Sequence, residues 1–368
     1  MIRDRGRRVS PLESVVFTTA ATFAAGIFIA PRILVADAGR SAGIALVTLY
    51  VLAVVWATVL ARSAAHLPNR APGVTLVQRL PILGYPWLAA VAIAELVIAS
   101  GGLAAYQDMI TAVELPNFSI LSVTVLFAVG AWTAARHRMQ GLSRVVLVFF
   151  TFFTALVLLS LLLLLTRAEE MHTLLPTTHL SLSGIATADV DTLFLFSGLG
   201  TLALTLPYHV RSESGLPHIA TGVAVTGALT LLAFVATVAT IGPDFVLANT
   251  WPLVTALRTL VLRNFFLDRF GLVVVFSWSA ITLCFLAIHV WAAGEAICQM
   301  VADERGRGWW TLGGMIIVVG VVVVGMGPVH EETIARSVEG PAALGLALGW
   351  LLVTMGLAWG RKLHAAPQ

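Results

Sequence analysis

An apolar stretch near the N-terminus carries a glycine and a proline at a spacing that can free backbone polar groups for binding. Thr22–Arg32 reads TFAAGIFIAPR, with Gly26 and Pro31 inside the apolar segment 12–36. Proline lacks an N–H and collides with the preceding helical turn, while glycine tolerates irregular backbone. Open backbone within a membrane needs protein or a cavity to cover it, and in transporters such breaks bind the solute. The pattern predicts an interrupted helix; a simple proline kink is the alternative.

A second stretch repeats this pattern in the segment 190–209. Phe196–Pro207 reads FSGLGTLALTLP, so glycines again precede a proline within one span. The two segments are five spans apart, and because five is odd they cross the bilayer in opposite directions. Paired interruptions in two halves indicate an inverted repeat with a binding site at the middle of the membrane. Free amides there attract a carboxylate and free carbonyls an ammonium, so we expect a zwitterionic amino acid or a small polar solute.

Three ionisable side chains fall inside apolar segments. Glu95 is surrounded by Ala, Leu, Ile and Val, while His289 and Glu295 share a later segment. Such groups are rare within membranes and usually face a partner or a cavity. We expect Glu95 to contact solute, water or a coupling proton, and His289, one helical turn from Phe285, to line the pocket. A packing role is the alternative for both. Glu295 lies near the cytoplasmic end, where we expect water to reach it.

The candidate site combines the two interruptions with the third and eighth spans. The predicted ligand-binding residues are Ala25, Gly26, Ile27, Glu95, Ile98, Gly198, Leu199, Gly200, Phe285 and His289. We predict Arg32 and Trp251 as gate residues on the outer side. Arg32 would pair with Asp37 or with an acid of the 268–269 region, and snorkelling of its side chain to the membrane interface is the alternative.

No motif in the sequence indicates an enzyme or a cofactor. We find no phosphate-binding loop of the Walker type, no Ser-His-Asp signal and no HExxH. His172 and His179 lie near Glu169 and Glu170, but their spacing matches no recognised metal site. The basic residues lie in short loops, so they do not indicate a nucleic-acid partner. We therefore expect a protein without catalytic residues, cofactor or metal ion.

Composition identifies the elements that hold these residues as membrane-spanning helices. Of 368 residues, 58% are hydrophobic and 11% charged, whereas soluble domains carry about 25% charged residues. We therefore predict an all-α polytopic protein of the lipid bilayer with ten transmembrane helices, the first and sixth interrupted. Apolar segments of spanning length lie at 12–36, 41–61, 86–113, 119–135, 143–165, 190–209, 217–241, 270–300, 309–327 and 341–360.

Loop charges predict the orientation of the chain. With the N-terminus in the cytoplasm, most of the 22 Lys and Arg residues fall in inside loops and ends, as the positive-inside rule requires. An even number of spans then places both termini in the cytoplasm. We expect cytoplasmic tails at 1–11 and 361–368, and one transmembrane domain, 12–360, built from a first repeat at 12–165 and a second at 190–360.

The outer face carries a further helical segment and most of the acidic loop residues. In the segment 243–269, Leu253 and Leu257 recur at one-face helical spacing, which predicts a short amphipathic helix over the outer mouth. An ordinary interfacial helix is the alternative. Acidic residues such as Glu332 and Glu339 are expected in solvated outer loops.

Four motifs in register resemble those of a known family over nearly the whole chain. They are Gly26-x4-Pro31-Arg32, Gly200-x6-Pro207 followed by Tyr208-His209, Trp251-Pro252, and Asp268-Arg269-Phe270 leading to Trp278. Together they resemble the B subunit of GerA-type spore-germination receptors. One departure is Ala24-Ala25-Gly26, where relatives often have Gly-x-Gly, so the opened turn has one permissive residue fewer.

The resemblance implies a fold and a function. That family belongs to the amino acid–polyamine–organocation transporter superfamily, which implies a LeuT-like inverted repeat of five plus five helices. It also implies sensing of a germinant, often an amino acid, in a complex with A-type and C-type subunits in the spore inner membrane. A proton- or cation-coupled amino acid transporter with the same pocket is the alternative. Glu95 would be its candidate proton carrier.

Overall fold

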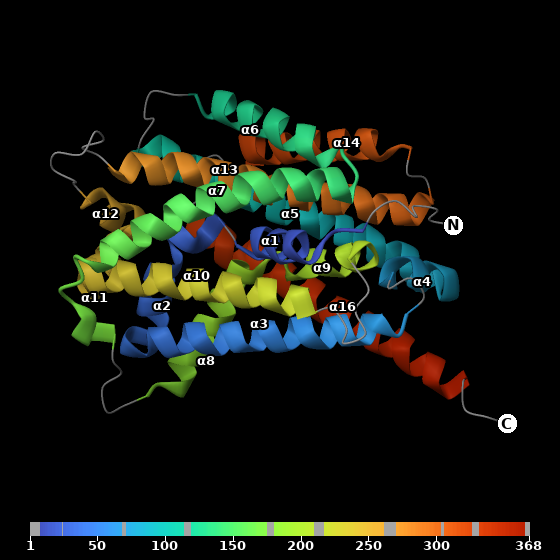
Figure 1. Ribbon diagram of the computed structural model, residues 1–368, viewed down its shortest axis with the longest axis horizontal. Helices are drawn as coiled ribbons and strands as arrows, with labels where there is room; N and C mark the ends of the chain where they lie inside the picture. The colour runs from blue at the N-terminus through green and yellow to red at the C-terminus, as the bar shows by residue number, and fades with distance from the viewer. Residues whose placement is uncertain are drawn as a thin grey trace.

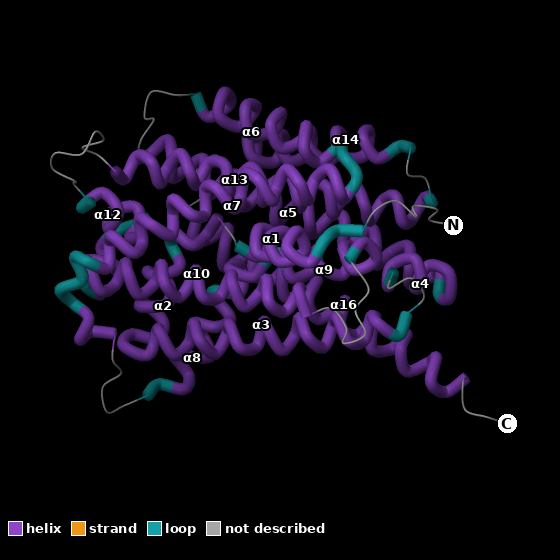
Figure 2. The backbone as a smooth tube through the Cα atoms, viewed as in Figure 1, coloured by secondary structure: helices purple, strands orange, loops and turns teal. Residues whose placement is uncertain are grey.

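The computed structural model is almost wholly helical over the residues that it describes. These are 8–23, 25–67, 71–113, 119–174, 180–209, 217–260, 270–302, 305–325 and 331–364. Among them, the β-type pairing is a single isolated bridge between Val9 and His209. Most of the helices run along the long axis of the molecule (Figure 1), and short loops join many of them at its two ends (Figure 2).

Long helices alternate with short ones along the chain. The α-helices are α1 (Pro11–Thr22), α2 (Ala30–Ala38), α3 (Ala42–Ala65), α4 (Pro72–Arg79), α5 (Pro81–Val113), α6 (Ile120–Ala135), α7 (Met139–Leu165), α8 (Leu182–Asp191), α9 (Leu199–Thr205), α10 (Pro217–Ile241), α11 (Pro243–Ala248), α12 (Pro252–Arg258), α13 (Phe270–Val301), α14 (Arg307–Gly320), α15 (Glu331–Ile334) and α16 (Gly340–His364). Short 3₁₀ turns are η1 (Ala25–Phe28), η2 (Gly39–Ser41), η4 (Met171–Leu174), η5 (Leu193–Phe196) and η6 (Leu206–Tyr208). Two π turns are η7 (Val321–Gly325) and η8 (Ala335–Glu339).

Seven helical stretches of the described chain are long and apolar enough to cross a membrane, and eight if the bent pair of α8 with Leu193–Tyr208 counts as one span. Another apolar helix, α6, is shorter. Each predicted apolar segment corresponds to helical residues, and α10 has the predicted bounds. However, α2 and α3 together form one of the seven stretches. The membrane-helix class is therefore confirmed, whereas the count of ten and the five-plus-five arrangement stay predictions.

The first predicted segment is interrupted, as its glycine and proline indicate. Ser10 and Glu13 form a capping box that starts α1. This helix ends at Thr22, and Phe23 then adopts an extended conformation. After the single turn η1, α2 begins with Pro31 in its first turn, where the missing N–H costs nothing. Pro31 therefore starts a second helix instead of merely bending the first.

The sixth predicted segment is also interrupted. α8 ends at Asp191, the turn η5 follows, and α9 begins at Leu199. The two helical parts are bent by 52° relative to each other. Pro207 lies in the closing turn η6, because a proline inside a helix removes a hydrogen bond and ends it.

The centre of the bundle is α13, which packs against α5, α7 and α6. In the most apolar stretch of α13, 89% of the residues are buried, whereas in that of α7 only 28% are buried. Outer helices expose large apolar side chains, among them Leu52, Leu126 and Phe152. Such exposure disfavours a soluble protein but suits contact with lipid chains. The arrangement is that of a multi-pass membrane protein with a protein-covered interior.

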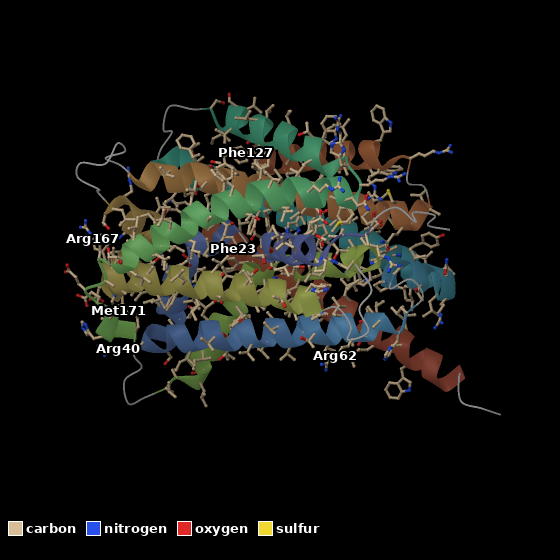
Figure 3. All side chains as sticks on the ribbon, in the orientation of Figure 1. Phe23, Arg40, Arg62, Phe127, Arg167 and Met171 are labelled. Carbon is tan, nitrogen blue, oxygen red and sulfur yellow. The ribbon has the colours of Figure 1, made fainter. Side chains whose placement is uncertain are left out.

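The two ends of the molecule carry different elements. α4 lies at the right of Figure 1 near the final turns of α16, while α11 and α12 lie at the left. Figure 3 places Arg40 and Arg167 at the left end and Arg62 further to the right. Segments predicted inside and outside thus lie at opposite ends of the bundle. Which end faces the cytoplasm stays a prediction, and the ends are called inner and outer according to that predicted orientation.

The predicted outer helical segment is present in its described part as α11 and α12. Leu253 and Leu257 of α12 are buried, and Arg258 is more exposed. α12 thus buries its apolar side chains and exposes Arg258, as an amphipathic helix does, whereas the position of 243–269 over the outer mouth stays a prediction. Residues 261–269, which include the predicted acid of the 268–269 region, lie outside the described residues.

Candidate functional site

The two interrupted segments meet with their backbones in contact. A Cβ atom on Gly198 would overlap the carbonyl oxygen of Ala21 and lie 2.9 Å from the nitrogen of Thr22. Gly26 approaches Phe194 of η5 in the same way, because a Cβ there would lie 2.6 Å from the ring atom Cδ2. At Gly198 only glycine permits this approach without moving the backbone, whereas a side chain at Gly26 would displace the ring of Phe194. The two interruptions are therefore adjacent, as the inverted-repeat hypothesis requires.

Aromatic rings fill the space around this junction. The ring of Trp278 on α13 has its centroid 5.2 Å from that of Phe23 and 4.6 Å from that of Phe28. Phe194 is fully buried. Tilted aromatic pairs of this kind stabilise the fold beyond the effect of burying their apolar surface. In this conformation the ring of Phe194 fills the space beside Gly26, so the two interruptions pack directly against each other.

A buried polar cluster joins three helices beside the second interruption. The Nδ1 atom of His289 on α13 lies 2.6 Å from Oε2 of Glu95 on α5. The hydroxyl of Thr201 on α9 lies 3.0 and 2.9 Å from the two carboxylate oxygens of Glu95, to which it donates. All three side chains are completely buried. Hydrogen bonds strengthen at low dielectric, so the cluster ties the interrupted segment to both flanking helices.

The sequence predicted two of these three residues. Glu95 and His289 stand out as ionisable groups within apolar runs, and the structure brings them together. Thr201 was missed, because threonine is common in membrane helices and its hydroxyl usually bonds the backbone of its own helix. Its position three residues after Gly198, on the first turn beyond the interruption, is the signal that could have identified it.

The other predicted residues surround the junction in different ways. Ile27 and Ile98 are buried, on η1 and α5. Leu199 begins α9 and is buried, whereas Gly200 faces α16, where a Cβ would lie 2.8 Å from Cδ1 of Leu346. Ala25 lies in η1.

Phe285 lies between the polar cluster and a double glycine of α5. Its ring centroid lies 4.2 Å from that of His289. A Cβ on Gly102 would lie 2.6 Å from its Cε1 atom, so the ring packs onto the backbone of α5. Phe285 thereby connects the predicted site residues of α13 with the glycine pair Gly101–Gly102.

The inner half of the bundle has a second buried polar cluster. Oε2 of Glu295 lies 2.5 Å from Nη1 of Arg307, and both side chains are buried. Tyr208 donates to Oε1 of Glu295 at 2.9 Å, and Gln299 does so at 3.0 Å. The expectation that water reaches Glu295 is therefore wrong, because the first turn of α14 supplies a charged partner that covers it.

The same inner end ties the start of α1 to the end of the sixth segment. The ring of His209 lies 2.6 Å from the Ser14 hydroxyl through Nδ1 and 3.0 Å from that of Thr205 through Nε2. The amide of Val9 donates to the carbonyl of Tyr208 at 3.0 Å. These bonds hold the two interrupted segments together on their inner side.

An ion-pair cluster connects the interrupted segments at their outer side. Nη2 of Arg336 lies 3.3 Å from Asp37 of α2, and the same guanidinium pairs with Asp191 at the end of α8. Nη2 also lies 3.1 Å from Glu332 of α15. The carboxylate of Glu332 contacts Arg32 at 3.2 Å. Arg32 thus pairs with Glu332, whereas Asp37, its predicted partner, pairs with Arg336.

The second predicted gate residue, Trp251, precedes α12 and is buried. α12 contacts η1 of the first interruption and the outer part of the bundle. α12 therefore lies against the first interruption, and the role of Trp251 as a gate residue stays a prediction.

Glu339 contradicts one expectation from the sequence. It was assigned to a solvated outer loop, but it is 3% exposed. A Cβ on Gly101 of α5 would lie 2.8 Å from its Cδ atom. The reason is that helical structure begins before residue 341, with α15 and η8, so Glu339 is carried into the bundle. Its Oε1 atom has no hydrogen-bond partner in the described part of the chain.

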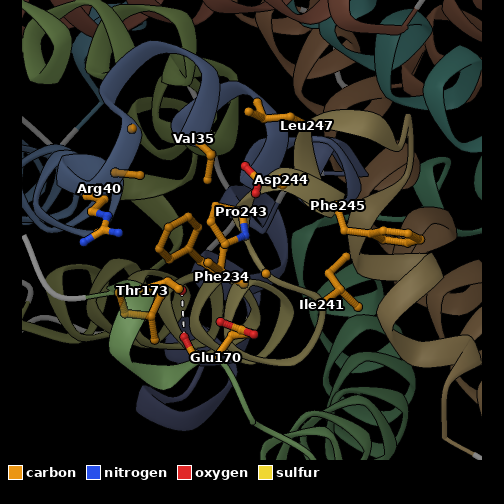
Figure 4. Close-up of a pocket in the computed structure, with 16 residues that line it drawn as sticks. Val35, Arg40, Glu170, Thr173, Phe234, Ile241, Pro243, Asp244, Phe245 and Leu247 are labelled. Atoms are coloured by element: carbon orange, nitrogen blue, oxygen red, sulfur yellow. Dashed lines mark hydrogen bonds between the residues drawn. The ribbon is translucent and has the colours of Figure 1, made fainter.

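A cavity of about 570 Å³ lies at the outer end of the bundle, away from the predicted site. Arg40, Glu170 and Asp244 line it around the ring of Phe234 (Figure 4). None of the predicted ligand-binding residues lines this cavity. Among the described residues, no group of three or more His, Cys, Asp or Glu could hold a metal ion.

Comparison with known proteins supports one assignment. A family model described as spore germination protein matches residues 8–326, which include both interruptions and the buried polar clusters. A comparison with curated proteins found no match.

Proposed function

The chain belongs to the spore germination protein family, and from this premise we propose that it is a germinant-receptor subunit of the membrane. In this proposal, ten spans form two inverted repeats, and a small solute binds between the interrupted first and sixth segments. An amino acid is the preferred ligand class, because interrupted helices offer amides for a carboxylate and carbonyls for an ammonium. The protein acts without catalytic residues or a cofactor.

The observation that carries the proposal is the junction between the two interruptions. Gly198 permits direct approach to the backbone of Ala21, and Gly26 lies against the ring of Phe194. The Glu95–His289–Thr201 cluster couples this junction to α5 and α13. Polar groups buried within a membrane usually face a partner or a cavity that serves function. Solute binding would separate the rings at the junction and so alter the packing of the surrounding helices.

Signalling in this proposal is a shift between two conformations. The described conformation is held closed by the outer ion-pair cluster around Arg336 and by the inner bonds around His209. A solute shifts this equilibrium only if it binds the open conformation more tightly. We propose that A-type and C-type subunits in the spore inner membrane respond to the shift through contacts with the lipid-facing helices.

A proton- or cation-coupled transporter is the second candidate function. The observation that favours it is the completely buried Glu95–His289 contact, since intramembrane acid and histidine chains serve as proton relays in transporters. Glu95 would carry the proton beside the solute. Both candidates use the same junction, so only a measurement of solute flux separates them.

Two experiments test these candidates. Thermal unfolding of the purified chain with amino acids, sugars and nucleosides identifies the solute, because a ligand of the native state raises the apparent stability. The chain is then reconstituted in liposomes with the labelled solute. Binding without uptake supports the receptor subunit, whereas accumulation driven by a proton gradient supports the transporter. Absence of stabilisation by any of these solutes would contradict both.

A deletion strain supplies the test in the organism. We expect spores that lack this chain to lose their response to one germinant while vegetative cells take up the same compound normally. Normal germination together with lost uptake would contradict the receptor function and support transport.

A further inference from the structure

Glu339 is a buried acid at the second interruption that the predicted site does not include. It is 3% exposed, and its Oε1 atom has no hydrogen-bond partner among the described residues. It ends η8, a π turn of five residues. Turns of this type inside helices are frequent at functional sites. A buried carboxylate without a partner is costly, so its presence calls for a physical explanation.

The surroundings of Glu339 place it at the junction. The turn η8 contacts both η5 and α5. On α5, Gly101 leaves room for the carboxyl group of Glu339, and Gly102 leaves room for Phe285. Phe285 in turn contacts His289 of the buried polar cluster. Glu339 thus contacts α5 at Gly101, which is six residues after Glu95. At about 1.5 Å per residue, this contact lies about 9 Å along the helix axis from Glu95.

The nearby cation on the same turn is already engaged. Arg336 lies three residues before Glu339, but its guanidinium pairs with Asp37, Asp191 and Glu332. Ser197, the residue that follows η5, has a buried hydroxyl that also lacks a hydrogen-bond partner in the described chain. Nε1 of Trp278 and Nε2 of His289 are further buried atoms near the junction without a partner in the described chain. Among these side chains Glu339 is the acid, so it is the one that can accept hydrogen bonds from a cation and balance its charge.

We propose that Glu339 receives the ammonium group of the solute, which makes the ligand class a primary amine such as an α-amino acid. This inference rests on the proposed function, since it requires a solute at the junction. An acid inside a membrane faces a partner or a cavity, and an ammonium supplies the charge and the hydrogen-bond donors that Glu339 lacks. The acid therefore determines that the site selects amines over otherwise similar neutral or acidic solutes.

The test compares amino acids with α-hydroxy acids of the same carbon skeleton. Dissociation constants are measured for the purified full-length chain, its Glu339→Gln variant and Glu169→Gln, which removes an exposed acid of an outer loop. We expect the wild type and Glu169→Gln to prefer the amino acid by at least about tenfold. Glu339→Gln should lose that preference while its affinity for the hydroxy acid stays within about threefold of wild type.

A second variant, Gly101→Ala, tests the inference without changing Glu339 itself, in case Glu339→Gln does not fold. Gly101→Ala places a methyl group where the Glu339 side chain lies, so it should weaken amine preference in the wild type but not further in Glu339→Gln. Retained amine preference in a folded Glu339→Gln variant would overturn the inference. So would a wild-type protein that binds a sugar or a nucleoside at the junction, although the proposed function would then stand. Absence of any solute binding would overturn both.

Discussion

At the scale of single residues, the contact between Glu95 and His289 yields a stability prediction. His289→Leu would leave the buried carboxylate of Glu95 with Thr201 as its remaining described partner. Removing one member of a buried pair costs about 3–5 kcal/mol, whereas replacing both members with apolar residues is often nearly neutral. We expect His289→Leu to lower Tm in detergent, and the double variant Glu95→Leu/His289→Leu to recover most of the loss. Additive losses would contradict the pairing.

The site residues show which signals a sequence carries at this scale. Glu95 and His289 could be predicted because an ionisable group inside an apolar run is expensive, so chance does not place it there. Thr201 carries a weaker signal, its position just after the second interruption, since a hydroxyl can equally bond the backbone of its own helix. Glu339 could not be predicted, because its depth depends on where helical structure begins, and charge alone assigned it to a loop. Glu295 was recognised as ionisable, but its partner Arg307 comes from another helix.

At the scale of elements, the contact between the two interruptions makes a prediction with a matched control. Gly198→Ala would force a Cβ into the backbone of Ala21 and separate α1 from α9, so we expect a lower Tm and loss of solute stabilisation. Gly313→Ala on α14 meets no atom within 4 Å, and helix propensity should raise stability by up to about 1 kcal/mol. Thermal unfolding with and without solute measures both. Equal behaviour of the two variants would contradict the close approach.

The outer ion-pair cluster predicts how the junction becomes accessible. Arg336→Gln removes the guanidinium that joins α2, α8 and α15. In a background with Cys284 and Cys298 replaced by serine, a thiol introduced by Ser197→Cys should then react faster with an external, membrane-impermeant reagent. Arg167→Gln, on an exposed loop, serves as the control and should leave the rate unchanged. Equal rates in both variants would show that the cluster does not close the junction.

The ends of helices could be predicted from the sequence where a proline or a glycine marks them. Pro217 and the glycine after Ile241 limit α10, and Gly26 with Pro31 interrupts the first segment. The short helix α4 and the turn η8 were not predicted. α4 is amphipathic rather than uniformly apolar, so a search for spanning segments passes over it. A π turn of five residues is too short to produce a recognisable hydrophobic periodicity in the sequence. Its position depends on how the neighbouring helices pack.

At the scale of the whole molecule, orientation follows from the positive charge of the loops. We expect a fluorescent reporter fused to the C-terminus to fold in the cytoplasm, and a reporter inserted in the 243–269 segment to lie outside. Protease protection of the two fusions in inverted vesicles would measure this. Opposite protection would reverse the assignment of both ends of the bundle. The class of the fold was predictable because composition alone requires a bilayer, whereas the number of spans was not, since broken helices blur the count.

The ring of Phe194 beside Gly26 also has a kinetic consequence. A solute cannot occupy that position until the ring and the neighbouring backbone move, so association must wait for a rearrangement of the protein. Observed binding rates should then stop rising at high solute concentration and level off at the rate of that rearrangement. In the proposed receptor, the movement of this one side chain would set a minimum delay before a spore responds, and more solute would not shorten that delay.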